Sequence, residues 1–185
     1  MGPAGIRLQE VAADAGVSHP TVLHHFGSRE HLVKAVTVRA LGAIHAQIVD
    51  AIGASTGEEE QLAAMLEAVF DAISRTGHAR VLMWLALEGH RVEFEAERET
   101  GGPGLAAVIE AAHALRKAKL PKGVRAPPRE DTAHVVVLCA LALVASSVMG
   151  STLFENAGLG ADPAAGAKFR AWLARWMKMH LDAGT

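Results

Sequence analysis

The sequence has few aromatic residues and almost no cysteine, and both shortages limit what the chain can be. Aromatic residues make up 4% of its 185 residues. It also lacks runs in which Val, Ile and Thr alternate with polar residues, as they do in half-buried strands. The one cysteine, Cys139, excludes an intrachain disulfide and fits a reducing compartment. Alanine is abundant instead, so we predict a nearly all-α fold.

Neither sign of charge predominates in the chain. Eighteen Lys and Arg face twenty Asp and Glu, which gives a formal net charge of −2. This balance excludes a generally basic, histone-like protein, so any nucleic-acid contact must come from a local patch. The start MGPAGIRLQE holds no apolar run typical of a signal peptide. We therefore expect a cytoplasmic protein.

The sequence has one long apolar run, from Ala133 to Met149. It is about one turn shorter than the ~20 residues that a membrane span usually needs. An apolar helix can instead be buried between two packing partners, and this is the interpretation we favour.

Motifs of enzymes and metal sites are missing as well. The sequence shows no GxSxG, no P-loop, no Rossmann glycine pattern, no HExxH and no cluster of Cys and His. Glu88 and His90 are two residues apart, so they point to different sides of a helix. We therefore expect no catalytic residue, no cofactor and no metal site, although the chain has ten histidines.

Gly and Pro residues divide the chain into predicted helices. The predicted helices cover about Leu8–Ala15, His19–Phe26, Ser28–Ile52, Glu58–Ser74, His78–Arg91, Leu105–Lys119, Glu130–Phe154 and Ala164–Leu181. In the last helix we expect one apolar face, with Lys168, Arg170, Arg175 and Lys178 pointing away from it.

The stretch AGVSHPTVLHHFGSREHL predicts two short helices joined by a tight turn. Gly16 suits the position just after the first helix, and Ser18 can cap the second. Pro20 sits in the first turn, where no intrahelical N–H is lost. This pattern is a helix-turn-helix, although many αα-hairpins share it. Its second helix would present small or hydrogen-bonding side chains to DNA.

The longer stretch LQEVAADAGVSHPTVLHHFGSREHLVKAV resembles the DNA-binding signature of the TetR family of transcriptional regulators. The resemblance implies an all-α fold, with one larger helical domain after the DNA reader. The matching residues are Val11, Ala12, Ala15, Gly16, Val17, Ser18, Thr21, His25, Phe26, Ser28, Glu30 and Leu32.

The resemblance also implies roles for individual residues. Thr21 and His24 would face the bases and His25 would contact a phosphate. Arg29 stands where the family usually has Lys, at a helix N-terminus that also attracts phosphate. The DNA-contacting residues that we predict are Arg7, Ser18, His19, Thr21, His24, His25 and Arg29.

Three features depart from the family pattern. Leu23 replaces a usual phosphate-binding Tyr, and Arg7 replaces a usual capping Thr. A whole helix precedes the position of Ile6 in the family, whereas only Met1–Gly5 precede it here. We therefore expect a shortened form in which part of the small core around Val11, Val22 and Phe26 is exposed.

The resemblance predicts two domains, an incomplete helix-turn-helix domain over residues 1–44 and a ligand-binding and dimerisation domain over residues 45–185. The expected function is a ligand-responsive regulator of transcription, a repressor released from a double-stranded DNA operator by a small apolar effector. One alternative is a DNA-free helical dimer that binds a small molecule or partner. An unrecognised α-helical enzyme is the other.

The larger domain carries two further sets of candidate residues. A pocket between the middle helices would be lined by Met65, Val69, Phe70, Met83, Trp84, Leu87, His113 and Val137. Such residues at helical spacing are also typical of plain core. A homodimer would pair the last two helices with their symmetry mates in a four-helix bundle. Its expected interface residues are Val144, Val148, Phe169, Trp172, Leu173 and Trp176.

Overall fold

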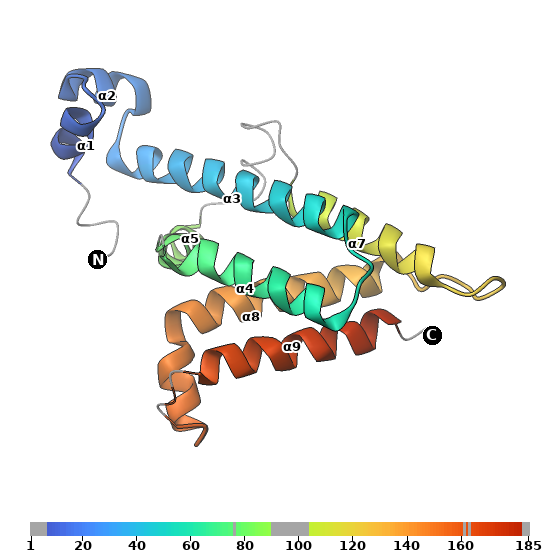
Figure 1. Ribbon diagram of the computed structural model, residues 1–185. Coiled ribbons are helices and arrows are strands. Elements are labelled where there is room, and N and C mark those ends of the chain that lie inside the picture. Colours follow the sequence, from blue (N-terminus) through green and yellow to red (C-terminus); the bar gives the residue numbers. More distant parts are fainter. Residues whose placement is uncertain (1–6, 76, 90–103, 161, 163, 183–185) are drawn as a thin grey trace.

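A computed structural model of the chain describes residues 7–75, 77–89, 104–160, 162 and 164–182. The described residues form helices and no strands, which confirms the all-α prediction (Figure 1). The helices are α1 Leu8–Asp14, α2 His19–Phe26, α3 Arg29–Gly53, α4 Glu59–Arg75, α5 His78–Leu87, α7 Leu105–Lys119, α8 Arg129–Asn156 and α9 Ala165–Asp182.

The predicted boundaries agree with these helices to within two residues at nearly every end. The exception is α5, which we expect to run to Arg91. It ends at Leu87, and Gly89 has a φ of 79°, a backbone conformation that favours glycine and stops a helix. Arg91 itself lies outside the described residues.

The helix-turn-helix projects from one end of a helical bundle. Figure 1 shows α1 and α2 beside the start of α3, and the rest of α3 runs along the bundle. Within the bundle α4 packs on α8 and α9, and α3 packs on α5 and α7. The long helix α3 is therefore the connection between the projecting helices and the bundle.

Three groups of buried apolar residues hold the fold together, and α3 contributes to each. Leu32 joins Ala12 and Val22 in the small core of the helix-turn-helix. Val38 packs with residues of α5. Ile44 belongs to the main core, which α3, α4, α5, α8 and α9 build. The helix α3 therefore connects the small core to the main core.

The apolar helix α8 is covered on one face only. Its residues Val135, Cys139 and Leu143, spaced four apart, are buried in the main core. Residues on another side, such as Leu138 and Leu141, are exposed, and only 22% of its most apolar stretch is buried. Within the described residues α8 packs against α4, α5, α7 and α9, and these helices leave its other side uncovered. By length and composition alone α8 and α3 are each able to cross a membrane, a test that core helices also pass.

One cation of α9 lies where we did not expect it. Arg170 is buried and faces α4, with its Nε 2.8 Å from Glu67 Oε2. Its guanidinium carbon is 3.8 Å from the centre of the Phe70 ring. The expectation that Arg170 points away from the packed side of the helix is wrong, because Arg170 lies on the same side of α9 as the buried Ala174 and Met177, and α4 covers that side.

Candidate nucleic-acid interface and interior cavity

The turn between α1 and α2 is fixed by backbone hydrogen bonds around Gly16. The Gly16 N–H donates to the Ala13 carbonyl (3.1 Å) and the Val17 N–H donates to the Ala12 carbonyl (2.9 Å). These two bonds form a Schellman motif, which requires a left-handed residue. Gly16 has a φ of 67°, as the prediction for this position requires. The turn therefore sets the angle between the two short helices.

The start of α2 is capped as predicted. The Ser18 hydroxyl accepts a hydrogen bond from the Thr21 N–H at 3.2 Å, and its oxygen lies 2.7 Å from the Thr21 hydroxyl. Pro20 occupies the first turn, where it removes no intrahelical bond. This short helix is thus stabilised at its N-terminus without any acidic residue, which leaves its exposed side free of negative charge.

One side of α2 is buried and the other is exposed. Val22 faces the small core, whereas Thr21, His24 and His25 are exposed. The His25 ring meets the edge of Phe26 with the ring centres 4.6 Å apart, which limits its rotation. The exposed side therefore carries a hydroxyl and two imidazoles, groups that can hydrogen-bond to base edges and phosphates.

The remaining predicted DNA-contacting residues flank this side. His19 is half-buried at the first position of α2. Arg29 begins α3 beside the capping Ser28 and lies 3.1 Å from Glu30 Oε1. Arg7 makes no capping bond to α1 and instead pairs with Glu10 at 3.3 Å.

The N-terminus of α3 already holds one carboxylate, that of Glu30. Hydrogen bonds from its own backbone N–H and from the Ser28 hydroxyl, with Arg29 beside it, hold the pKa of Glu30 below its usual value. The positive end of the 25-residue helix adds to this effect. A phosphate could use these donors only in place of the Glu30 carboxylate.

The small core is better covered than we expected. Val22 is buried, and Val11 and Phe26 are half-buried against it. The expected exposure of this core is therefore wrong for Val22, because residues of α1 and Leu32 of α3 cover it.

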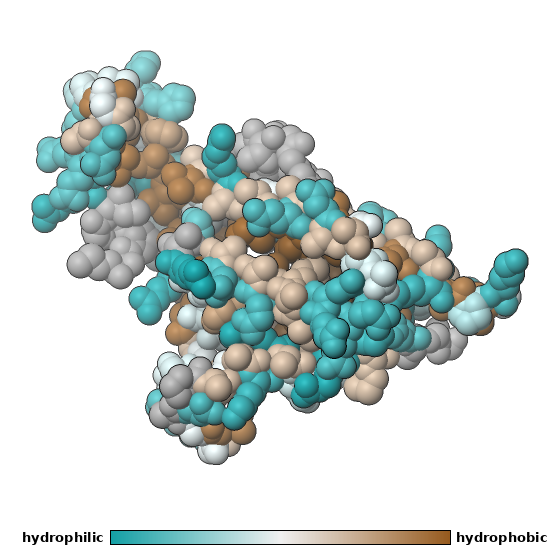
Figure 2. All heavy atoms as spheres, in the orientation of Figure 1, coloured by the Kyte–Doolittle hydropathy of each residue, from teal (hydrophilic) through white to brown (hydrophobic). Residues whose placement is uncertain are grey.

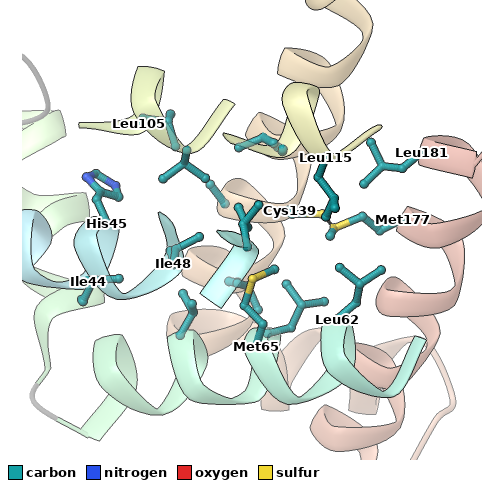
Figure 3. A pocket seen from close by; sticks show the side chains of 18 of the residues that line it. Ile44, His45, Ile48, Leu62, Met65, Leu105, Leu115, Cys139, Met177 and Leu181 are labelled. Atoms are coloured by element: carbon teal, nitrogen blue, oxygen red, sulfur yellow. Dashed lines mark hydrogen bonds between the residues drawn. The ribbon is translucent and has the colours of Figure 1, made fainter. Parts of the chain in front are cut away.

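A second feature is a cavity inside the bundle. It has a volume of about 150 Å³ and is lined by residues of α3, α4, α7, α8 and α9 and by Leu82 of α5. Figure 3 shows His45 and Leu105 at one end and Leu115 and Leu181 at the other. In Figure 2 hydrophobic side chains show through between α3 and α4. The wall is almost wholly apolar, as expected for a small-molecule site.

Two of the eight predicted ligand-contacting residues, Met65 and Val69, line this cavity. Both belong to α4, on the side that faces the bundle interior. Sequence reasoning missed the rest of the wall, including Leu62, Ile48 and Leu105.

The other six predicted ligand-contacting residues lie elsewhere. Trp84 packs against the Val38 cluster, and Phe70 lies beneath Arg170. The His113 Nδ1 is 3.1 Å from the Thr132 hydroxyl. Leu87 is 86% exposed and Val137 is also exposed. Met83 is half-buried and does not line the cavity.

A buried arginine forms part of the cavity wall. The Arg116 side chain is 2% exposed and its Nη1 pairs with Asp131 of α8. Its Nη2 donates to the carbonyl of His180, near the end of α9, at 3.0 Å. Arg116 therefore joins α7 to the two last helices. The only signal for Arg116 in the sequence is its position in the basic C-terminal end of a helix.

Cys139 also lines the cavity and is buried. Burial raises the pKa of its thiol from 9.0 to about 11. Its Sγ donates to Met177 Sδ at 3.4 Å. The thiol is therefore held protonated at neutral pH and acts as an apolar wall residue.

The predicted interface residues fall into two groups. Trp172 is 51% exposed, and Phe169 stacks beside it with ring centres 6.1 Å apart. Trp176 is half-buried against the ring of His180. In contrast, Leu173 is 2% exposed inside the main core and Val144 lines the cavity, while Val148 packs partly on that core.

The exposed apolar side of α8 and α9 is more extensive than the predicted set. The exposed apolar residues on these helices are Val137, Leu138, Leu141, Met149, Leu153, Trp172 and Met179. Helical spacing identified Trp172 but did not identify the five residues on α8 as an exposed side, because α8 is apolar all round.

Comparisons with known proteins agree with the site. Residues 2–36 match the family described as bacterial regulatory proteins, tetR family. Over 149 residues the chain is 30% identical to the HTH-type transcriptional activator FasR of Mycolicibacterium smegmatis. This match covers 80% of this chain and 63% of that protein. Over 97 residues it is 30% identical to the HTH-type transcriptional regulator BetI of Rhizobium meliloti. This match covers 52% of this chain and 47% of that protein.

The helix-turn-helix segment matches the tetR family of bacterial regulatory proteins, and the chain is similar to two HTH-type transcriptional regulators. Its matches span less than two thirds of the length of these two relatives. No solved structure matches the chain.

Proposed function

We propose that the protein is a DNA-binding regulator of transcription, with α2 entering the major groove of an operator. The observation that carries this proposal is the capped helix α2, whose exposed side bears Thr21, His24 and His25. It lies within the matched segment 2–36. Thr21 and His24 would contact bases, while His25, Arg29 and Arg7 would contact phosphates.

A division of labour between residues 1–44 and 45–185 is part of the proposal. Residues 1–44 would bind DNA, and the remaining chain would bind the effector and form the dimer. The long helix α3 continues through this boundary, from Leu32 in the small core to Ile52 at the cavity. A ligand that favours one position of α3 would then favour one position of α2.

A twofold homodimer is the form in which the protein would act. The support for it is the exposed apolar side of α8 and α9, which the described residues leave uncovered. Pairing this side with its symmetry mate makes a four-helix bundle. Two readers held about 34–36 Å apart would then meet successive major grooves on one face of DNA.

The proposed effector site is the interior cavity. Its apolar wall suits a small apolar molecule. We propose repression that the effector relieves, because a ligand between α3 and the other helices would change the spacing of the two readers. The name of the M. smegmatis relative describes an activator. A transcription assay with the operator of this protein in front of a promoter separates repression from activation.

The proposal is tested by selecting binding sites from a random duplex library with the full chain. The expected result is an enriched, nearly palindromic sequence with half-sites about one helical turn apart, or a multiple of that spacing. Thr21→Ala/His24→Ala should not enrich it, whereas Lys122→Ala, in the exposed loop after α7, should. Failure of the parent to enrich any sequence would favour a DNA-free helical dimer.

A further inference from the structure

The wall of the cavity is charged at one end only. His45 is the polar side chain at the end where Leu105 lies. The charged side chains that line the cavity come from the C-terminal parts of α7 and α9 and are Arg116, Lys119, Lys178 and Asp182. The cavity is therefore an apolar chamber with an ionic end.

Two of the three cations at this end are matched by nearby carboxylates. Arg116 pairs with Asp131 and also donates to the Thr132 hydroxyl at 3.4 Å. The Lys178 ammonium lies 2.7 Å from Asp182 Oδ2. The pKa of Lys178 is raised, mainly by its hydrogen bond to Asp182, with smaller contributions from carboxylates at the start of α4. These two cations and their partners leave little net charge on the wall.

Lys119 differs from them. Within the described part of the chain no carboxylate lies within ion-pair distance of its ammonium. Its Nζ lies against the backbone of Gly57, because a Cβ built on Gly57 would be only 2.2 Å away from it. Lys119 and Asp182 are exposed, so this end of the cavity faces solvent. The cavity mouth thus carries a cation that a ligand can reach.

From this arrangement we infer that the cavity binds a small apolar monoanion, with its carboxylate at Lys119 and its hydrocarbon body inside. The inference rests on the proposed role of the cavity and names its ligand class. The hydrocarbon body of the ligand would break no hydrogen bond of the apolar wall. Its carboxylate would stay partly hydrated at the cavity mouth. A buried carboxylate without a partner would cost far more.

The size of the cavity limits the ligand. An engineered dry cavity of about 150 Å³ in another protein holds benzene. The cavity here has about that volume. A ligand of roughly six to ten non-hydrogen atoms therefore fits with small adjustments of the wall. Octanoate is a suitable probe, and octan-1-ol has nearly the same shape without the charge.

The test is isothermal titration calorimetry of the full chain with octanoate and with octan-1-ol. Lys119→Met should lower the affinity for octanoate about tenfold and leave that for octan-1-ol unchanged. Lys117→Met is the matched control, because Lys117 is exposed on the same helix and does not line the cavity. It should leave both affinities unchanged. Added salt should weaken octanoate binding alone.

A further variant separates the ligand class from the site. Ala112→Leu fills the cavity wall and should weaken both probes. Equal affinities for the two probes, with no effect of Lys119→Met, would overturn the inference about the anion and keep the cavity as a binding site. If neither probe binds the parent, or Ala112→Leu weakens neither, the proposed cavity function fails together with the inference.

Discussion

The hydroxyl oxygens of Ser18 and Thr21 lie 2.7 Å apart at the start of α2. Ser18 caps the helix, while Thr21 is proposed to contact DNA. One bond thus links the stability of the helix to the position of a side chain that would contact a base. The hydroxyl of Thr21 can still donate to or accept from a base while it is bonded to Ser18.

Replacing Ser18 with Ala should weaken α2. The loss of a capping side chain costs about 1 kcal/mol. We expect faster hydrogen exchange at the N–H groups of α2 and weaker DNA binding. Ser18→Asp keeps an acceptor at the cap and should retain native exchange. Native exchange rates in Ser18→Ala would show that the cap does not hold this helix.

Replacing Arg170 with Ala should lower the free energy of unfolding by about 2 kcal/mol, since the buried guanidinium joins Glu67 and the Phe70 ring. The half-exposed Glu67 keeps the loss below that of a buried pair. Arg175→Ala is the control, because Arg175 is exposed and its ion pair with Glu59 is long, at 4.0 Å. This change should lower the free energy of unfolding by under about 0.5 kcal/mol. Urea denaturation measures both. Equal losses would contradict the account.

The stability of the protein should fall between about pH 9 and pH 11 through Cys139. Its pKa is raised to about 11 in the folded chain, so the unfolded chain releases the proton first. Stability from this group is present below pH 9 and is lost as the pH rises, by about 2 kcal/mol at pH 11. The difference between the parent and Cys139→Ala in urea denaturation isolates the thiol. A constant difference over this pH range would contradict the prediction.

The dimer should depend on the exposed side of α8 and α9. Leu141 is 63% exposed, so Leu141→Arg should leave the fold intact and yield monomers in sedimentation velocity. Trp172→Glu should act in the same way. Val124→Arg, which changes an exposed apolar residue in the loop before α8, should leave the dimer unchanged. A monomeric parent, or a Leu141→Arg variant that stays dimeric, would place the interface elsewhere.

Local signals in the sequence were sufficient for the helix-turn-helix. A glycine at a helix end, a capping serine and a proline in the first turn act within a few residues, so Gly16, Ser18 and Pro20 were placed correctly. The cavity depends on which helix covers which face, and periodicity does not show this. Trp84 fits a pocket by composition but packs on α3 instead, and Arg170 is covered because α4 lies over it.

The same reason explains the interface. On α8 all faces are apolar, so the pattern did not separate Leu143, which is buried in the core, from Leu141, which is exposed. The position of α4 and α9 decides between them. Sequence reasoning therefore proposed two helices for the interface and named only part of the exposed apolar surface on them.

Fluorescence anisotropy with a labelled duplex that carries the selected site tests the central claim most directly. The parent should bind this site at least about a thousandfold more tightly than a scrambled duplex. Thr21→Ala/His24→Ala should lose about 1–3 kcal/mol for each base contact on the selected site and bind the scrambled duplex as the parent does. Arg29→Ala should weaken binding to both duplexes and lower the salt dependence of that binding. A double variant that binds the selected site as tightly as the parent would contradict the assignment of α2 as the helix that reads DNA.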